Sequence, residues 1–426
     1  MADIKPFQAL RFSEKRFPTP PVAPPYDIIS EKRRSEIARD SYNIIHIDKP
    51  GPAADAKRYE RAAALLAQWK NEGVLITEEE EALYVYQETY TVPERDNTKP
   101  LVRTGFFACL KLVDFTEGIV LPHEKTLAAP KVDRMNLMKA TKGNMSPIFG
   151  LYHDTTQTIA PVIRDVFDTE PVYTVYKDSD GTEHTLWRLT DRAKIQRVVA
   201  ALKNEKIIIA DGHHRYETAL SYRDYLAENG LHTEAADYIM LCLVDFSDEG
   251  LVVLPTHRLL EMPIATDELL QKLSAYFDVE KTTKQTMTDW VAAIDAGIPS
   301  IGLYTKEKTY YRLTLKKGCA WESLMPAGSS AAWKQLNVSI LSFVVFKTVL
   351  SLSEEKFQQV VSYTHSFFEA LEAVDTGAAG CTFLLQGIDK FTVKEISENG
   401  ELMPQKSTYF YPKLFTGFVM YEHGKG

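Results

Sequence analysis

The amino-acid sequence predicts a mixed α+β protein: a mixed sheet flanked by helices, with an N-terminal extension and a C-terminal α+β unit. Residues 82–92 and 101–115 alternate aromatic and polar side chains, as the two strands of an antiparallel hairpin do. The β-branched run Ile207–Ile209 is typical of a buried strand, and residues 215–225 have a helical pattern. From residue 264 onward, short helical and strand patterns alternate, which indicates a separate unit.

The first 80 residues are expected to form an extension that wraps around the core. Five prolines between residues 18 and 25 exclude a regular helix and a central strand, so this stretch should run extended over another surface. Ser30 is placed to cap an amphipathic helix. Residues 42–48 (YNIIHID) favour a strand, and residues 55–72 favour a helix that ends at Gly73.

Residues 81–262 are expected to form the core, with one mixed sheet over residues 80–260. The hairpin is followed by a loop, LPHEKT (121–126), and by a helix that Asp133 should cap. The remaining predicted elements are a strand at 148–152, a helix at 159–167, a hairpin over 171–189 that turns at Ser179, Asp180 and Gly181, a helix at 191–203, the Ile-rich strand with its helix, and strands within 237–246 and 250–260.

Residues 263–426 are expected to form the C-terminal α+β domain. Its predicted elements are helices beginning at residues 266 and 286, strands at 278–281, 300–305 and 309–316, helices at 332–350 and 366–373, a strand at 380–388 and a helix at 390–400. The domain then ends with the stretch MPQKSTYFYPK (403–413).

Composition disfavours several classes of protein. The net charge is -9, with 58 acidic and 49 basic residues, whereas non-specific binding to nucleic acid depends on clustered Lys and Arg. Cys109, Cys242, Cys319 and Cys381 are widely spaced and lack a metal-binding pattern, which favours free thiols in a reducing compartment. No segment resembles a signal peptide or a membrane span of roughly 20 apolar residues. We therefore expect a cytoplasmic protein without a membrane partner; its oligomeric state is not indicated.

Three segments carry residues suited to chemistry. In the LPHEKT loop, the carboxylate of Glu124 beside the imidazole of His123 suits a general base. After the Ile-rich strand, DGHHR (Asp211–Arg215) combines a glycine, which lets N–H groups converge on an anion, with side chains that donate hydrogen bonds to phosphate or carboxylate oxygens. The KST loop (Lys406–Thr408), with Lys413 further on, could cradle a carboxylate or a phosphate.

Each segment also has a plainer interpretation. LPHEKT could be a solvated loop, DGHHR a turn in which Asp211 caps the helix, and the KST loop an ordinary capped turn. His257 and Arg258 could line the same site, although a basic pair at a strand end is more often exposed. Tyr26 and Asp27 could close over a pocket or only anchor the N-terminal extension.

The order of these motifs resembles known families. The sequence lacks the GxxxxGK[ST] P-loop and the GxGxxG, HExxH and GxSxG motifs, so a nucleotide would be held by another device. DGHHR after an Ile-rich strand resembles the signature loop of the ParB and sulfiredoxin-like superfamily, which binds nucleotide phosphates or a related anion. Pro122-His123-Glu124, DGHHR and the KST loop resemble motifs of the free serine kinases. The chain as a whole is similar to the bacterial domain-of-unknown-function family 1015, which carries the HEKT, DGHHRYETAL and MPxKSTYFYPK stretches together.

The resemblance implies roles for these residues. It implies a ParB/sulfiredoxin-like core, a base at Glu124 that takes the proton of the substrate hydroxyl, and Mg²⁺ with ATP or ADP as cofactor; Asp211 or Glu124 could help to hold the metal. The implied catalytic residues are Glu124, His123 and Asp211, the implied phosphate-binding residues are Gly212, His213, His214 and Arg215, and the implied substrate-binding residues are Lys406, Ser407 and Thr408. The chain departs from the kinases at Tyr409 and Phe410, where their motif continues with Arg and His.

We therefore predict a kinase-like phosphotransferase that acts on a small molecule. It would transfer a phosphoryl group from ATP or ADP to the hydroxyl of serine or a related small hydroxy or amino acid. The alternative is a ParB-type switch protein that binds or hydrolyses nucleotide to control contact with DNA or another protein; the acidic net charge and the HE loop count against it. A sulfiredoxin-like role would need a cysteine in the signature loop, where this chain has histidine.

Overall fold

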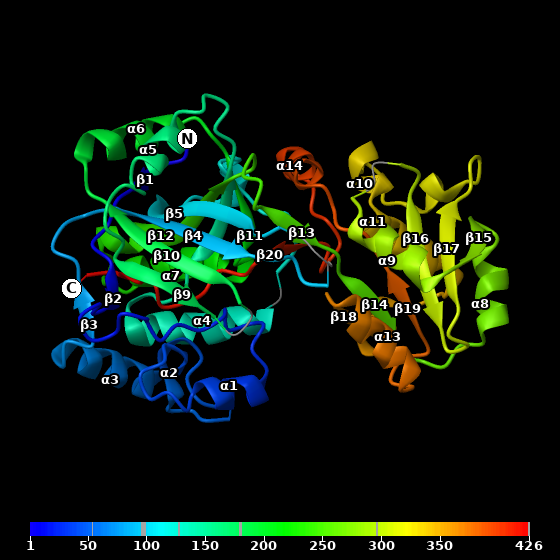
Figure 1. Ribbon diagram of the computed structural model, residues 1–426, viewed down its shortest axis with the longest axis horizontal. Helices are drawn as coiled ribbons and strands as arrows, with labels where there is room; N and C mark the ends of the chain where they lie inside the picture. Colours follow the sequence, from blue (N-terminus) through cyan, green and yellow to red (C-terminus); the bar gives the residue numbers. More distant parts are fainter. Residues whose placement is uncertain (53, 95–98, 127, 179–180, 295–296, 425–426) are drawn as a thin grey trace.

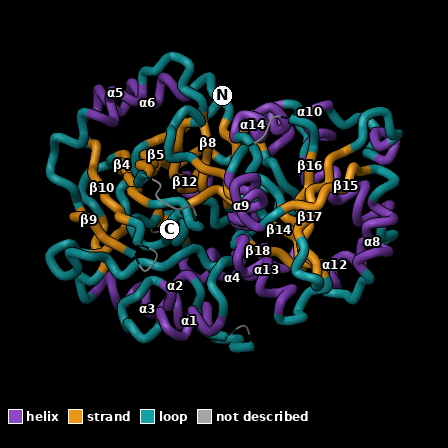
Figure 2. Tube along the Cα trace, turned by 45° about the vertical axis from the view of Figure 1, so that its right-hand side comes forward, coloured by secondary structure: helices purple, strands orange, loops and turns teal. Residues whose placement is uncertain are grey.

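The computed structural model describes residues 1–52, 54–94, 99–126, 128–178, 181–294 and 297–424. It has two lobes, one built around a nine-stranded sheet and the other around a six-stranded sheet (Figure 1). Helices flank both sheets (Figure 2), which confirms the predicted mixed α+β class.

The N-terminal extension packs on the first lobe. Its elements are β1 (Ile4–Lys5), β2 (Leu10–Phe12), α1 (Glu31–Ile37), α2 (Ile45–Asp48), α3 (Arg58–Asn71) and β3 (Leu75–Thr77). The Ser30 cap is confirmed, since its side chain accepts a hydrogen bond from the Arg33 N–H. The strand predicted over 42–48 is wrong: these residues turn into α2, where the Asn43 side chain accepts from the Ile45 N–H at 3.0 Å. Packing of the isoleucines into a small core with Trp69 outweighs their preference for strands.

The nine-stranded sheet has the order β6-β11-β8-β12-β5-β4-β10-β9, with β1 also paired to β5. Its strands are β4 (Leu83–Tyr90), β5 (Leu101–Lys111), β6 (Val120–Leu121), β8 (Ile148–Tyr152), β9 (Tyr173–Lys177), β10 (Glu183–Leu189), β11 (Ile207–Asp211) and β12 (Tyr238–Asp245). The predicted β4–β5 hairpin is confirmed as antiparallel. Both faces are covered, because successive residues of β11 and β12 alternate between two apolar clusters. This explains why the Ile-rich strand is buried on both sides.

Helices and short strands complete this lobe. They are η1 (Phe115–Glu117), α4 (Ala128–Thr141), β7 (Gly143–Asn144), α5 (Ile159–Arg164), α6 (Arg192–Leu202), α7 (His213–Glu228) and η2 (Glu234–Asp237). Asp133 does not cap α4: the helix begins earlier, and the Asp133 carboxylate instead pairs with Arg58 at 2.8 Å and Arg134 at 2.5 Å. The turn predicted at Ser179 and Asp180 lies outside the described residues.

The six-stranded sheet has the order β15-β17-β16-β19-β14-β18. Its strands are β14 (His257–Leu260), β15 (Phe277–Thr282), β16 (Ser300–Thr305), β17 (Tyr310–Leu315), β18 (Val361–Thr364) and β19 (Cys381–Leu384). The helices of this lobe are α8 (Thr266–Leu273), α9 (Lys284–Ala292), η3 (Trp321–Leu324), α10 (Ala331–Gln335), α11 (Asn337–Ile340), the π-helix η4 (Leu341–Val349), α12 (Glu354–Val360), α13 (Phe367–Asp375) and α14 (Lys390–Glu398). Of the described helices, none alone has the length and apolar character to cross a membrane; Asn337–Val349 and Glu354–Val360, bent by 108°, pass that test only as a pair.

The chain crosses between the lobes more often than the sequence pattern predicts. The expectation of one sheet over residues 80–260 is wrong at its end, because β14 pairs with β18 and β19 in the second sheet. Pro255, which lacks an N–H, separates it from β13 (Val252–Leu254). The C-terminal segment then returns to the first lobe, where β20 (Tyr409–Tyr411) pairs with β13 and β21 (Tyr421–Glu422) pairs with β7. The division at residues 80/81 and 262/263 stays a prediction.

Candidate functional site

The HEKT, DGHHR and KST segments contact one another although they are far apart in the sequence. His123 Nε2 lies 2.7 Å from Thr408 Oγ1, and the His123 N–H donates to His213 Nε2 at 3.2 Å. Lys413 Nζ donates to Asp211 Oδ1 at 2.7 Å. Parallel β6 and β11 bring the first two segments to the same sheet edge, and the returning C-terminal segment adds the third.

His123 is a neutral imidazole with a fixed tautomer. Its Nδ1 lies 2.6 Å from the carbonyl oxygen of Ile209, which can only accept, so Nδ1 carries the proton. Burial lowers the pKa of His123, and its side chain is 1% exposed. Nε2 is therefore an acceptor, and the hydroxyl of Thr408 donates to it.

His213 is held in the same way. Its Nε2 accepts the backbone N–H of His123, which leaves Nδ1 to carry the proton of the neutral ring. Burial, and next the neighbouring His123, lower the pKa of His213 well below its usual value. The two rings meet edge to face with centroids 4.6 Å apart. His213 therefore offers one N–H donor at the first position of α7.

The carboxylate of Glu124 lies in a cradle of backbone N–H groups. Oε1 accepts from the Ser407 N–H at 3.0 Å and the Thr408 N–H at 3.3 Å, and Oε2 accepts from the Lys406 N–H at 3.3 Å. Lys406 has a φ of 57°, and a left-handed residue in such a run turns consecutive N–H groups toward one point. The KST loop thus forms an anion-binding concavity, and in this conformation the anion is Glu124.

Asp211 is the centre of a buried ion-pair triad. It pairs with Lys413 at 2.7 Å and with Arg215 at 2.5 Å, and both cationic side chains are less than a tenth exposed. Burial alone would raise the pKa of the Asp211 carboxyl, but the charges of Lys413 and Arg215 hold it well below its usual range. The predicted capping by Asp211 is wrong, since Gly212 is the N-cap residue and no side chain caps α7 within the described part.

Gly212 shapes the N-terminus of α7. Its φ is 94°, and a Cβ at this position would lie 3.0 Å from Arg215 Nε. The missing side chain lets Arg215 fold back onto Asp211 and the carbonyl oxygen of Pro147. The guanidinium Nε remains buried without a hydrogen-bond partner. Arg215 thus braces the DGHHR turn, and the N-terminal end of α7 keeps its positive dipole.

Basic groups of the second lobe complete the surroundings. His257 and Arg258 are not exposed as expected of a strand end: they are 0% and 2% exposed. The ring of His365 stacks on Tyr409 with centroids 3.6 Å apart. Burial first, and then the charges of Lys413, Lys406 and Arg258, lower the pKa of His365 to about 4. The cationic side chains of Lys406, Lys413 and Arg258 thus gather near His365 on the KST side of the site, although the chain is acidic overall.

Residues of the extension and of α4 close the other side. The ring of Tyr26 lies 3.8 Å from the Arg134 guanidinium and 6.0 Å from that of Arg215. Burial lowers the pKa of His214, while the nearby Asp27 and Glu217 carboxylates act to raise it. Tyr26 and Asp27 thus lie against the DGHHR segment.

The carboxylates of the site do not fit a protein-held magnesium ion. Asp211 uses one oxygen for Lys413 and the other for Arg215, and both oxygens of Glu124 accept from backbone N–H groups. A group of three or more His, Cys, Asp or Glu side chains that could hold a metal is not found in the part of the chain that the structure describes. In this conformation neither Asp211 nor Glu124 is available as a magnesium ligand.

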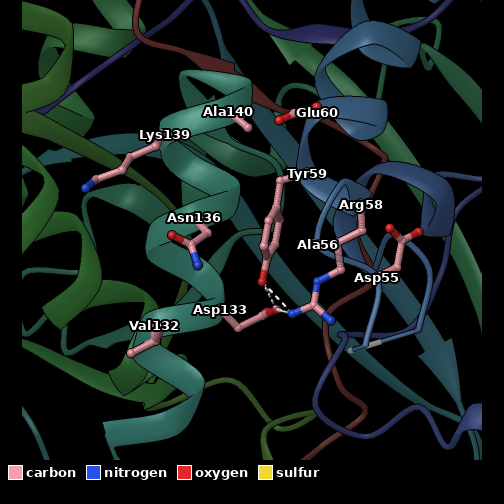
Figure 3. A pocket seen from close by; sticks show the side chains of 10 residues that line it. All are labelled: Asp55, Ala56, Arg58, Tyr59, Glu60, Val132, Asp133, Asn136, Lys139 and Ala140. Carbon is pink, nitrogen blue, oxygen red and sulfur yellow. Dashed lines mark hydrogen bonds and ion pairs between the residues drawn. The ribbon is translucent and has the colours of Figure 1, made fainter.

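A separate groove lies between α3 and α4 (Figure 3). It has a volume of about 720 Å³ and contains none of the HEKT, DGHHR or KST residues. Arg58 and the Tyr59 hydroxyl of the extension both donate to Asp133 of the core there. The groove therefore lies where the extension packs on the core, apart from the three segments.

The fold and site define a two-lobed mixed α+β protein with an anion-accepting site at one sheet edge. The chain belongs to the family described as "Protein of unknown function (DUF1015)", whose model matches residues 4–339 and so includes the HEKT and DGHHR segments. A search of curated proteins finds no sequence match.

Solved structures give distant likenesses. A conserved hypothetical protein from Pyrococcus furiosus is 13% identical with a TM-score of 0.35, covering 74% of this chain and 95% of its own. Free serine kinase in complex with AMP is 12% identical with a TM-score of 0.33, covering 75% and 92%. SbnI with a C-terminal truncation, from Staphylococcus aureus, is 8% identical with a TM-score of 0.36, covering 74% and 86%.

Sequence reasoning named most residues of this site but missed two connections. Lys413 follows the KST loop in the sequence, but only the fold shows that it pairs with Asp211. Arg258 holds the KST loop from the other lobe, with Nη2 donating to the Lys406 carbonyl oxygen at 2.8 Å. The sequence places Arg258 in a basic pair that could line the site, but no local pattern shows which groups its guanidinium contacts.

Proposed function

We propose that this protein is a small-molecule kinase that transfers a phosphoryl group from ATP or ADP to the hydroxyl of serine or a related small hydroxy or amino acid. The observation that carries the proposal is the meeting of three segments whose N–H groups and cations suit two anions, a phosphate and a carboxylate. Phosphoryl transfer requires mainly positioning and charge stabilisation, and this arrangement can supply both.

The phosphates would bind at the N-terminal end of α7. Gly212 has no side chain to cover the free backbone N–H groups at the start of α7, and His213 carries a donor proton on Nδ1. The Asp211–Arg215–Lys413 triad would fix this turn rather than touch the ligand through Arg215, whose guanidinium is already engaged. Mg²⁺ would arrive with the nucleotide phosphates, a common binding mode for this ion.

The substrate carboxylate would bind at the N–H groups of the KST loop. Those groups now hold Glu124, so a substrate carboxylate would displace a carboxylate of the same chemistry. Once released, Glu124 would lie beside the bound substrate and could accept the proton of its hydroxyl. Neutral His123 would keep Thr408 in place through Nε2.

The motif resemblance supports two finer assignments. We propose that the core belongs to the ParB and sulfiredoxin-like superfamily and that the protein acts in the cytoplasm. The first follows from DGHHR after the Ile-rich strand, and the second from the four cysteines, which are all free thiols, as expected in a reducing compartment.

The experiment is a phosphorus NMR assay with Mg²⁺, ATP or ADP, and a panel containing L-serine, L-threonine, L-homoserine and glycerate. We expect a phosphomonoester from at least one acceptor with the wild type. Glu124→Gln should lose at least 100-fold in rate, as expected for a general base, and Glu398→Gln, at the exposed end of helix α14, should react like the wild type. Absence of product with every acceptor and both nucleotides would refute the proposal.

A further inference from the structure

Arg258 is a buried cation that reaches the KST loop from the second lobe. It lies on β14 of the six-stranded sheet and is 2% exposed. Among the described residues it has no carboxylate within ion-pair distance, which is unusual for a buried arginine. Burial lowers its pKa to about 10, so the guanidinium still carries its charge at neutral pH.

The acceptors of Arg258 are backbone carbonyl groups. Nη2 donates to the Lys406 carbonyl oxygen at 2.8 Å and to the Gln405 carbonyl oxygen at 3.4 Å, and Nη1 donates to that of Thr256. The guanidinium also lies 5.4 Å from the Tyr363 ring centroid. Arg258 therefore holds the KST loop by its main chain.

Two of these carbonyl groups belong to the peptide units that bind Glu124. The Gln405 carbonyl shares its peptide unit with the Lys406 N–H, and the Lys406 carbonyl shares its unit with the Ser407 N–H. In a trans peptide the C=O and N–H bonds point in opposite directions. The same two units donate to Glu124 at 3.3 Å and 3.0 Å. Each unit thus lies between a guanidinium and a carboxylate.

This arrangement favours an anion on the N–H side. A cation at the carbonyl end of a peptide dipole fixes the orientation of the unit and polarises it, which strengthens the hydrogen bond that its N–H donates. Both peptide units are polarised in the same direction, so the charge of Arg258 favours an anion at their N–H groups although Arg258 does not contact that anion.

We propose that Arg258 is the positioning residue of the KST anion site: it holds two peptide groups from the second lobe so that their N–H groups bind a small carboxylate. The inference rests on the proposed function only in treating this anion as the substrate carboxylate. This role would also make β14 of the second lobe part of the site, because the KST loop would be held correctly only when β14 lies against it.

The test uses Glu124→Ala in the full-length chain, because this change empties the N–H cradle. Formate is the probe, and its affinity is read from the rise in melting temperature with concentration, against sodium chloride at equal ionic strength. We expect formate to stabilise Glu124→Ala and not the wild type. Adding Arg258→Gln, which keeps donors but removes the charge, should weaken formate binding about tenfold. Adding Arg258→Lys, which keeps the charge, should weaken it less than about threefold.

A control is Arg223→Met, which removes an arginine that holds the Leu112 carbonyl oxygen at 3.1 Å from the C-terminal half of α7, away from the DGHHR end. It should leave formate affinity unchanged. The proposal would be overturned if formate bound equally well to Glu124→Ala/Arg258→Gln and to Glu124→Ala/Arg258→Lys. It would also be overturned if Glu124→Ala were folded but formate did not raise its melting temperature. If Glu124→Ala does not fold, amide exchange in the wild-type background decides: Arg258→Gln should speed exchange at Lys406 and Ser407 at least tenfold, and no change would overturn the proposal.

The outcomes separate this inference from the proposed function. If phosphorylated product forms and Arg258→Gln leaves the KM of the hydroxy acid unchanged, the kinase stands and the role of Arg258 is refuted. If no product forms but formate binding depends on the charge of Arg258, the anion site stands and the kinase is refuted. In an active enzyme, Arg258→Gln should raise the KM of the hydroxy acid about tenfold and leave that of the nucleotide within twofold.

Discussion

Replacing Asp211 by asparagine should destabilise the protein more than replacing either cation of its triad. Asp211 pairs with Lys413 at 2.7 Å and with Arg215 at 2.5 Å, and their side chains are 9% and 8% exposed. Asp211→Asn leaves two buried cations together without a carboxylate, and removing one member of a buried ion pair costs about 3–5 kcal/mol. Lys413→Met leaves Asp211 paired with Arg215, so it should cost about 1.5–3 kcal/mol, the value of a charge-assisted hydrogen bond.

The assay is urea unfolding at neutral pH, followed by tryptophan fluorescence. Glu398→Gln is the control, because it breaks a partly exposed ion pair with Lys394 and should change stability by no more than about 0.5 kcal/mol. The reasoning is refuted if Asp211→Asn stays within about 1 kcal/mol of the wild type, or if Lys413→Met is the more damaging change.

The difference in unfolding free energy between the wild type and Asp211→Asn should depend on pH. The pKa of Asp211 is lower in the folded chain than the usual Asp value of about 4, so its stabilisation is complete above that pH and is lost as the pH falls below it. The stability difference between the wild type and Asp211→Asn should therefore shrink on acidification.

Three further predictions concern neighbouring residues. Gly212→Ala should cost about 1–3 kcal/mol in urea unfolding, because φ is 94° and the new Cβ would lie 3.0 Å from Arg215 Nε; a neutral effect would contradict this. Thr408→Val should cost about 1–3 kcal/mol because it leaves His123 Nε2 without a donor, whereas Thr408→Ser should stay close to the wild type. Burial lowers the pKa of His257 to about 3, so on acidification the unfolded chain takes up this proton before the folded chain, and stability falls as the pH drops below about 6.5. In melting curves at a series of pH values, His257→Gln should reduce this loss of stability. A loss equal to that of the wild type would contradict the prediction.

Local patterns predicted the centre of the first lobe. The Ile-rich strand and the helix after DGHHR became β11 and α7, and the alternating strands at 82–92 and 101–115 became the β4–β5 hairpin. These elements are long or have a strong hydrophobic period, and the positions that the period predicts to be buried belong to residues that favour the observed helix or strand. Residues 42–48 failed because a short isoleucine-rich segment can be buried as a strand or as a turn of helix, and packing against Trp69 decided it.

The residues of the site were more predictable than their connections. Polar runs next to strands mark sheet edges where ligands bind, so His123, DGHHR after its strand and the KST loop before a strand could be named from the sequence. Of the two partners of Asp211, Lys413 is 202 residues away, and no local pattern carries that information. Nor could the sequence show that Glu124 occupies the N–H groups of the KST loop, because this depends on how the C-terminal segment returns to the first lobe.

Hydrogen exchange on adding a ligand tests the central claim that three distant segments form one site. With ADP, Mg²⁺ and L-serine present, amide exchange should slow together in residues 121–126, 209–216 and 404–413. Residues 55–60 and 132–140, which flank the groove of Figure 3, should exchange as before. Slower exchange confined to one of the three segments, or found in that groove instead, would contradict the account.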